Sequence, residues 1–336
     1  MVPRRHVLGM AIGAGGVATL ALAVLVSFAA SVSAQQAEQP ARVAFLSGGP
    51  FAPGLLKTLE AALAEAGWRA DKNLVIEYRS AEGHYDRLPG LVDEMLRFKP
   101  HVILSNQTPT THAIRKVTST IPIVMVGHGD PVRYGLVTSL ARPDNNLTGI
   151  SFNVNEVGVK LLDLLKEAAP QVRRVGFFVN PENAGAAPLI EAARAAAPHL
   201  GLVIRPAEVS SVGTLEEVLA ALAREGVDAL CLGPEAFIIA NRQRILDFAR
   251  AHRLPAVGGT PSFAHSGALM TYSAHWPSIV RAAARYTDRL LRGVKAADLP
   301  IEQPDRFELI VNARSAKALG LTLSPALLAR VDQLIE

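Results

Sequence analysis

Val43-Ala44-Phe45-Leu46 and the loop that follows it, Ser47-Gly48-Gly49-Pro50, show the pattern on which this chain is built. Consecutive apolar residues without polar alternation are typical of a strand that is buried on both faces of a sheet. The next segment, 55–66, has apolar residues at helical spacing and is followed by Gly67, a residue type that commonly ends helices. The stretch therefore predicts a strand, a loop of small residues and a covering helix.

The same unit of strand, loop and helix recurs along the rest of the chain. Strands that are apolar on both faces and joined by helices indicate parallel sheets with helices on each side. We therefore predict an α/β fold of two similar, doubly wound parallel-sheet lobes. Further strands are predicted at 74–78, 101–104, 121–126, 147–152, 175–179, 202–204, 229–232, 255–258, 268–272 and 307–311, and two short helical segments close the chain.

The order of these units predicts where one lobe gives way to the other. We expect the first lobe at 42–150, completed by the helix near 275–292, and the second lobe at 151–271, completed by 305–336. Ligands of such folds bind beyond the carboxyl ends of the strands, so the loops there are where recognition is expected. The strands that join the lobes, and hence the candidate hinges, lie near 149–153, 272–275 and 305–311.

Residues 1–34 have the pattern of an export signal. Arg4 and Arg5 precede the uncharged run 7–30, and Val32-Ser33-Ala34 is a small-x-small cleavage site. The arginine pair also fits a twin-arginine signal, so Sec and Tat export both stay open. A run of about 24 apolar residues can span a bilayer, so an uncleaved membrane anchor is the alternative to cleavage. We expect a periplasmic protein, tethered to the membrane if the signal is not cleaved.

Composition argues against several classes of partner. The formal charge of the whole chain is +4, and the leader contributes two Arg and no acidic residue to it. No cluster of five or more Lys and Arg occurs, so we expect no nucleic-acid partner. Cys231 is the only cysteine and lies in an apolar strand pattern, which favours a buried thiol over a disulfide or metal ligand. We expect neither a metal nor a cofactor.

A search for catalytic motifs is negative. The chain has no Gly-x-Ser-x-Gly, Walker or His-Glu-x-x-His motif. The segment 13–18 imitates a dinucleotide fingerprint, but it lies inside the predicted signal and follows no strand. The histidines are scattered, and His84 is best explained as a solvated residue at a loop or helix start. We therefore expect no enzyme, and turnover abolished by Glu235→Gln would be the sign of one.

Hydroxyl and amide side chains follow several of the predicted strands. Beside helix N-termini and glycines, such groups suit the binding of a small anion such as a carboxylate. The same residue types also serve as helix caps, so both roles stay open at each position. Asp130, before Pro131, either caps the next segment or meets a ligand amine. The other candidate residues are Ser47, Ser105, Asn106, Thr108, Asn180, Asn183, Glu235 and Thr260.

Several short motifs together resemble one known family. They include Ile76-Glu77-Tyr78-Arg79, Tyr85-Asp86-Arg87-Leu88-Pro89, Asp130-Pro131-Val132, Asn146-Leu147-Thr148-Gly149 and Phe307-Glu308-Leu309-Ile310-Val311-Asn312. Through these motifs the chain is similar to the ABC-transporter substrate-binding protein family of the type I periplasmic-binding fold, the group related to tryptophan- and tyrosine-binding proteins. It departs from that family at Asp144-Asn145, where a Gly pair is usual, and at His84, where Gln is common.

The resemblance implies a two-lobed receptor that closes on a small molecule and passes it to an ABC permease in the inner membrane. It implies a small carboxylate or an amino-acid-like ligand, an aromatic one included, with Phe51, Phe237 and Trp276 walling the pocket. We expect a monomer without enzymatic activity. The alternative is a periplasmic sensor that reports its ligand to a membrane signalling protein, and the sequence does not separate the two.

Overall fold

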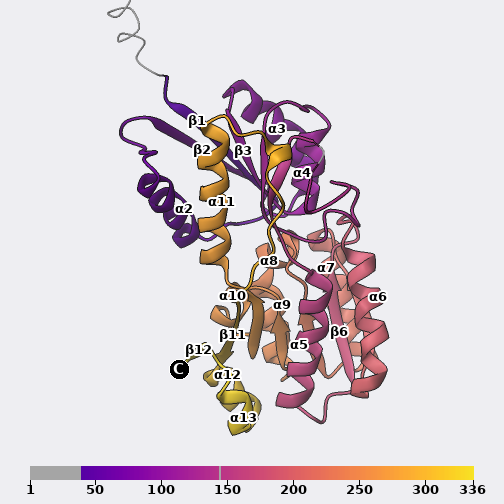
Figure 1. The fold of residues 1–336 in the computed structure, drawn as a ribbon. Helices are drawn as coiled ribbons and strands as arrows, with labels where there is room; N and C mark the ends of the chain where they lie inside the picture. The colour runs from indigo at the N-terminus through magenta and orange to yellow at the C-terminus, as the bar shows by residue number, and fades with distance from the viewer. Residues whose placement is uncertain (1–38, 144) are drawn as a thin grey trace, which may run out of the picture. The chain divides into compact units, whose positions relative to one another are not determined.

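The computed structural model describes residues 39–143 and 145–336, so the predicted signal segment 1–34 lies outside the described residues. The chain from Ala41 to Glu336 forms one compact unit that contains two separate sheets (Figure 1). Strands and helices alternate along most of it, which confirms the predicted α/β class. In the described residues, every helix is too short or too polar to span a bilayer.

The first sheet has five strands in the order β2-β1-β3-β4-β5, and all its neighbouring strands are parallel. Four of the five are almost wholly buried, as their unbroken apolar sequences predict, while β2 is the partly exposed edge. The elements are β1 (Ala41–Ser47), α2 (Pro53–Glu65), β2 (Leu74–Ser80), α3 (Leu88–Arg97), β3 (Val102–Asn106), α4 (Thr108–Arg115), β4 (Ile123–His128) and β5 (Leu147–Ser151).

The second sheet has seven strands in the order β12-β11-β10-β9-β8-β6-β7. Its strands are β6 (Arg174–Val179), β7 (Val203–Glu208), β8 (Ala229–Leu232), β9 (Ala256–Gly258), β10 (Met270–Ala274), β11 (Phe307–Asn312) and β12 (Gln333–Ile335). Its helices are α5 (Val154–Ala168), α6 (Ala186–Ala196), α7 (Val212–Glu225), α8 (Ala236–Ala240), α9 (Arg242–Ala251), α10 (Pro261–His265), α12 (Ala313–Leu319) and α13 (Pro325–Leu328).

The second sheet is not wholly parallel, because β11 runs antiparallel to β10. Between these two strands the chain leaves the second sheet and forms α11 (Trp276–Leu291), which lies beside α2 against the first sheet (Figure 1). Trp68 Nε1, just after α2, donates a hydrogen bond of 2.9 Å to Asp288 of α11. The chain returns to the second sheet at the same end at which β10 leaves it, and β11 is therefore antiparallel to β10.

We propose the lobe boundaries that the sequence suggests, 42–150 with 275–292 and 151–271 with 305–336. The argument for them is that β5, β10 and β11 each end or begin at a passage from one sheet to the other. The segment that follows α11 stays with the first sheet, since Glu302 bridges to Ile150 of β5. The passages lie close to the three candidate hinges.

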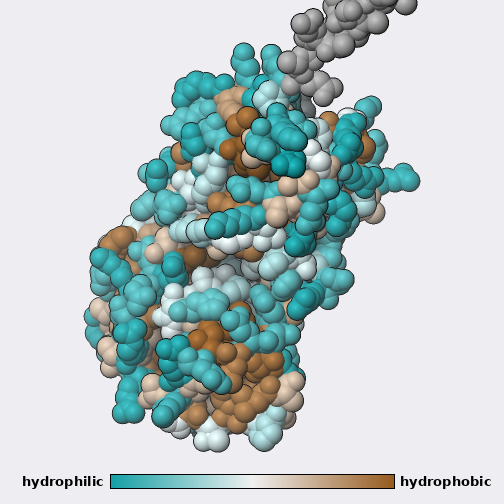
Figure 2. All heavy atoms as spheres, turned by 90° about the vertical axis from the view of Figure 1, so that its left-hand side faces the viewer, coloured by the Kyte–Doolittle hydropathy of each residue, from teal (hydrophilic) through white to brown (hydrophobic). Residues whose placement is uncertain are grey.

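The chain end differs from the sequence prediction in one respect. The two short helices, α12 and α13, are present, but a short edge strand, β12, follows them. β12 pairs with β11 over three residues and is largely exposed, so it has no apolar pattern to reveal it. Figure 2 shows an apolar patch on the lower part of the molecule, at the level of the C-terminal elements in Figure 1. Leu328 of α13 and Leu334 of β12 are among the exposed large apolar residues.

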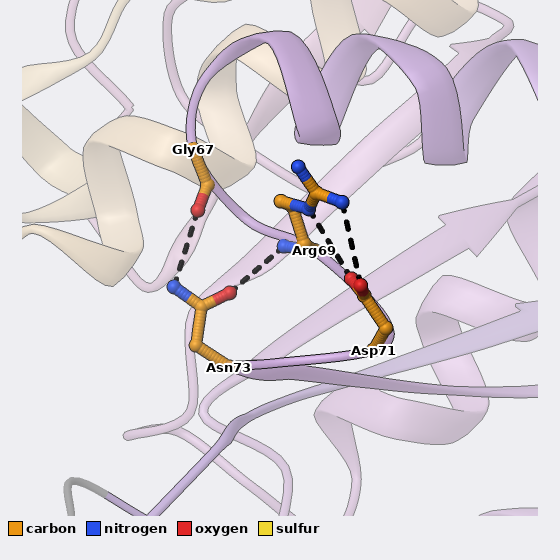
Figure 3. A network of polar contacts seen from close by, with 4 residues as sticks. All are labelled: Gly67, Arg69, Asp71 and Asn73. Carbon is orange, nitrogen blue, oxygen red and sulfur yellow. Dashed lines mark hydrogen bonds and ion pairs between the residues drawn. The ribbon is translucent and has the colours of Figure 1, made fainter.

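A polar turn connects α2 to β2 and explains why the helix stops where the sequence predicts. Gly67 has a φ of +97°, a conformation that glycine adopts without strain. Asn73 Nδ2 donates to the Gly67 carbonyl at 3.1 Å, and Asn73 Oδ1 accepts the backbone N–H of Arg69 at 2.8 Å (Figure 3). Arg69 also forms an ion pair with Asp71. The backbone N–H of Trp68 donates to the Leu63 carbonyl at the helix end, and the Asn73 bonds hold the turn that follows.

Cys231 lies in β8 with no exposed surface, as predicted for a buried thiol. Burial raises the pKa of its thiol, which disfavours the reactive thiolate. We expect native protein at pH 8 to give no reaction with a disulfide reagent such as DTNB over minutes. The same protein in denaturant should release one equivalent of thionitrobenzoate. Rapid labelling without denaturant would contradict this assignment.

Candidate functional site

A cavity of about 610 Å³ lies where the carboxyl ends of both sheets' strands meet. From the first sheet it is lined by residues that follow β1, β3 and β4, and from the second by residues that follow β6, β8 and β9. Parallel strands present these ends along one edge of a sheet, which is where open α/β sheets bind ligands. The volume is within the range of small-molecule sites, about 300–1,000 Å³.

Seven of the ten residues predicted from the sequence line this cavity. They come from the ends of five different strands, β1, β3, β6, β8 and β9, and the sheet order brings them together. They are Phe51, Asn106, Thr108, Asn180, Asn183, Glu235 and Thr260.

Ser47 and Ser105 do not line the cavity, and their hydroxyls support its walls instead. Ser47 Oγ donates to the carbonyl of Gly49 at 2.7 Å and so shapes the loop after β1. Ser105 Oγ lies 2.8 Å from Thr110 Oγ1 and 2.7 Å from Thr111 Oγ1, in a buried network under α4. Both serine hydroxyls have hydrogen-bond partners within the protein, because these side chains point into the fold.

Asp130 and Phe237 also lie away from the cavity. Asp130 Oδ1 accepts the backbone N–H groups of Val132 and Arg133, each at 3.1 Å, so it takes the capping role that was the alternative to binding an amine. Phe237 belongs to α8, and its ring is fully buried in the core of the second lobe. Its expected place in the pocket wall is therefore wrong, since the α8 backbone turns the ring inward.

Aromatic rings form one side of the cavity. Trp276 meets Phe51 edge to face, with centroids 6.1 Å apart, and it meets Phe152 in the same way at 6.4 Å. Gly127 permits this arrangement, because a Cβ there would lie 2.9 Å from the indole ring. The Trp276 ring is thus held between Phe51 and Phe152, in edge-to-face contacts that aromatic pairs favour.

Among the described residues, three donors in the cavity lining have no hydrogen-bond partner, namely the Ser262 hydroxyl and two side-chain nitrogens. Asn180 has no exposed surface, and its Oδ1 accepts the backbone N–H of Glu182 at 3.0 Å. That bond orients the amide and leaves Asn180 Nδ2 unpaired. The indole nitrogen of Trp276 is the second unpaired nitrogen. Buried donors without partners are costly, so the site favours a guest that carries acceptor atoms.

The N-terminus of α4 adds further donor character to the same cavity. Gln107, the residue before the helix, has a φ of +76° and provides no side-chain cap. Gln107 and Thr108 both line the cavity. The uncapped N–H groups of a helix start carry partial positive charge and favour a nearby anion.

Glu235 is a buried carboxyl group in the cavity lining. Its Oε2 accepts the backbone N–H of Phe237 at 2.8 Å, and its Oε1 accepts the hydroxyl of Tyr85 from the first lobe. Burial nevertheless raises the pKa of Glu235 to about 7, because loss of solvation outweighs these hydrogen bonds. The carboxyl group can therefore exist in either charge state near neutral pH.

This raised pKa predicts a pH dependence of stability. A carboxyl with a higher pKa in the folded state stabilises the fold fully below its ordinary value of 4.5, and this contribution is lost as pH rises through about 7. The difference corresponds to about 3 kcal/mol in the free energy of unfolding. We expect urea unfolding between pH 5 and pH 8 to show this loss for the native sequence. In Glu235→Gln the pH slope should be flatter, and an unchanged slope would contradict the assignment.

The two lobes approach closely beside Glu235, and glycines make the approach possible. A Cβ on Gly49 would lie 2.9 Å from the Cβ of Ala236, and one on Gly83 would lie 2.8 Å from the Cα of Phe237. Both glycines belong to loops of the first lobe, whereas both partners belong to α8 of the second. The backbones of the two lobes therefore approach closely at this point.

Gly49→Val tests whether this approach is needed for binding. The added side chain would overlap Ala236 when the lobes meet but would leave each lobe intact, so we expect at least a tenfold loss of ligand affinity by calorimetry. The matched control is Gly54→Val, because a Cβ at Gly54 meets nothing within 4 Å. Equal affinities for the two variants would show that closure at Gly49 is not required.

The cavity also contains residues that the sequence patterns did not single out. Gln107, Tyr134, Phe152 and Arg242 line it, and Tyr85 reaches Glu235 from outside the lining. Gln107 follows a predicted strand, so the rule that ligands bind beyond the carboxyl ends of strands applies to it as it does to Asn106 and Thr108. Phe152 directly follows β5, so the same argument applies to it. Tyr85, Tyr134 and Arg242 lie on helices or a longer loop, where no spacing rule points to the cleft.

Among the described residues, no group of three or more His, Cys, Asp and Glu side chains could hold a metal ion. The cavity instead combines unpaired donors, one buried carboxyl group and an aromatic wall. This chemistry suits the noncovalent binding of a small polar molecule with an apolar part.

Comparison with known proteins gives consistent results. Residues 48–335 match the family described as ABC transporter substrate binding protein. A tyrosine-binding protein from Clostridioides difficile is 23% identical over 268 residues, which cover 80% of this chain and 76% of that protein. An ABC domain from Streptococcus pneumonia, solved in complex with L-Trp, has a TM-score of 0.81 at 21% identity and covers 88% of this chain and 100% of its own. A conserved domain protein from Vibrio cholerae has a TM-score of 0.81 at 26% identity, with the same coverage.

Proposed function

Because this chain belongs to the ABC transporter substrate-binding protein family, we propose that it is the extracytoplasmic receptor of an ABC importer for an aromatic amino acid. The family consists of solute-binding proteins and not of enzymes. The observation that carries the ligand proposal is the pairing, in one cavity, of an aromatic wall with unpaired donors and a buried carboxyl group.

The polar part of the cavity matches the two charges of an amino acid. A ligand carboxylate would accept hydrogen bonds from Asn180 Nδ2 and would lie near the uncapped start of α4 at Thr108. A ligand ammonium would pair with Glu235 and hold it in the ionised form. The binding of such a ligand near pH 7 should therefore release a fraction of a proton.

The apolar part of the cavity matches an aromatic side chain. Phe51, Phe152 and Trp276 offer ring faces and edges on which a planar group can stack. A tyrosine-binding relative and an L-Trp complex in the same fold support this choice of side chain. Ligand contacts to both lobes would favour the closed arrangement, since binding energy then depends on closure.

Isothermal titration calorimetry with L-tryptophan, L-tyrosine and L-phenylalanine tests the proposal. We expect at least one of them to bind with micromolar or tighter affinity. Tryptamine, which lacks the carboxylate, and indole-3-propionate, which lacks the ammonium, should each bind at least tenfold more weakly than L-tryptophan. Binding of myo-inositol with no response to any aromatic amino acid would overturn the ligand proposal.

The importer role needs a separate experiment. Deletion of the gene should reduce uptake of the radiolabelled ligand into cells, and expression of the intact chain should restore it. Cell fractionation should find the protein outside the cytoplasm, where it can reach a membrane permease. Normal uptake in the deletion strain, with an altered transcriptional response to the ligand, would favour a sensor instead.

A further inference from the structure

The cavity does not end at the residues proposed to hold an amino acid. It continues into the second lobe, between α10 and the strands β11 and β12. We call this extension the polar branch and define it by six lining residues. They are Arg242, Ser262, His265, Ser266, Glu308 and Gln333.

The topology sets the polar branch at a distance from the proposed amino-acid site. In the second sheet the order is β11-β10-β9-β8-β6, and Asn180 follows β6 while Glu308 lies in β11. Three strands therefore separate the two ends of the cavity along the sheet edge. Since strands are about 4.8 Å apart, the cavity extends on the order of 15–20 Å along the sheet edge, which leaves room beyond the α-amino and α-carboxyl groups of an amino acid.

Arg242 supplies a positive charge to the polar branch. Its Nε donates to Ser266 Oγ at 3.0 Å and its Nη1 donates to the carbonyl of Ile239 at 2.9 Å. These bonds orient the guanidinium group, and no described acidic side chain forms an ion pair with it. A guanidinium group held in this way is suited to bind a carboxylate or another planar anion.

Hydroxyl groups without hydrogen-bond partners lie on α10 and β10, two elements next to the branch. Ser262 Oγ, Thr271 Oγ1 and Ser273 Oγ are buried and have no hydrogen-bond partner among the described residues. Thr271 pairs with Ile310 and Ser273 with Glu308 across the antiparallel ladder, so these side chains share the sheet face that lines the branch. Of the three, Ser262 is the one that lines the cavity, so its hydroxyl is available to a guest that brings its own hydrogen-bonding atoms.

The branch opens to solvent at its far end. His265 and Gln333 are exposed, whereas Thr260, nearer to the proposed amino-acid site, is buried. Glu308 of β11 is the acidic residue of the branch, and burial raises the pKa of its carboxyl group. Its carboxylate repels an anion, so Arg242 is the group of the branch that an anion is expected to contact.

We propose that the polar branch binds a second, anionic group carried at the ring end of the ligand, with Arg242 as its partner. The preferred ligand class is then an aromatic amino acid whose ring bears a carboxylate or a similar anion, with the ring itself against Trp276. This inference rests on the proposed function, because it takes the amino-acid end of the ligand to lie near Asn180 and Glu235.

The test compares two probes that differ only in charge at the ring end. These are 4-carboxy-L-phenylalanine and its neutral isostere 4-carbamoyl-L-phenylalanine, both titrated into the native protein by calorimetry. We expect the carboxylate to bind at least tenfold more tightly than the amide. Arg242→Gln should reduce this ratio to within twofold of unity, while Arg242→Lys should keep part of it.

Arg244→Gln is the matched control, because Arg244 pairs with Glu216 on the surface and does not line the cavity. It should keep the full ratio, and circular dichroism should show that all variants are folded. Equal binding of the two probes to the native protein, or a ratio unchanged by Arg242→Gln, would overturn the inference. If L-tyrosine still bound in that case, the proposed function would stand. If no aromatic amino acid bound at all, the proposed function itself would fail.

Discussion

Asn180→Asp is expected to reduce ligand affinity by about a thousandfold. The change replaces the unpaired donor Asn180 Nδ2 by an oxygen and sets a negative charge where the ligand carboxylate is proposed to bind. Loss of a charge-assisted hydrogen bond costs about 1.5–3 kcal/mol, and repulsion in a buried site adds to it. A total of about 4 kcal/mol corresponds to this change in Kd. Calorimetry with L-tryptophan or L-tyrosine measures it.

The fold should survive this substitution, since an aspartate retains the oxygen that accepts the backbone N–H of Glu182. Asn73→Asp is the matched control, because it makes the same chemical change in the polar turn of Figure 3, at a partly exposed position that does not line the cavity. We expect the control to bind within twofold of the native protein. A similar affinity for Asn180→Asp would remove Asn180 from the proposed site.

Gly149→Ala is expected to lower the free energy of unfolding by about 4 kcal/mol. Gly149 lies in β5 with a φ of +125°, a conformation that costs other residues about 1–3 kcal/mol. A Cβ there would also lie 2.5 Å from the backbone nitrogen of Met125 and still closer to its carbonyl oxygen. Backbone atoms of a central strand cannot move aside, so overpacking adds a cost of similar size. Urea unfolding followed by circular dichroism measures the sum.

Gly90→Ala provides the control for this prediction. Gly90 lies in α3, and a Cβ there meets no atom within 4 Å. In a helix this change is expected to be neutral or to stabilise by about 0.5–1 kcal/mol. Should Gly149→Ala unfold at the same urea concentration as the native protein, the tight contact with Met125 would be wrong. A large loss of unfolding free energy for Gly90→Ala would contradict the open space around its Cβ position.

The alternation of strands and helices was predictable because each element carries its own pattern. The strands β1, β3, β4 and β8 are short apolar runs bounded by loops of small or polar residues, and burial on both faces requires that composition. The strand β12 lacks it, since its residues are mostly exposed and pair with one neighbour only. The reversed direction of β11 has no local signal at all, because it follows from the path of the chain through α11.

The site was predictable to the extent that strand ends define it. Asn106, Asn180 and Glu235 follow strands that point at the cavity, and the general rule for α/β sheets was enough to select them. Ser105 and Asp130 meet the same rule, yet the protein saturates them with its own hydroxyl and N–H groups. Whether a polar residue after a strand bonds to a ligand or to the protein depends on small differences in side-chain position. The spacing of residues along the sequence does not determine these differences.

The α/β class, most strand positions, the family resemblance and the loops that form the site follow from the amino-acid sequence alone. These depend on interactions between residues close in the chain, which hydrophobic period and turn chemistry record. Three features emerge only in the folded chain: Trp276 contacts Phe51, Tyr85 bonds to Glu235 across the lobes, and Arg242 extends the cavity. Such pairs are separated by many residues and meet through the packing of whole lobes, so no local pattern carries them.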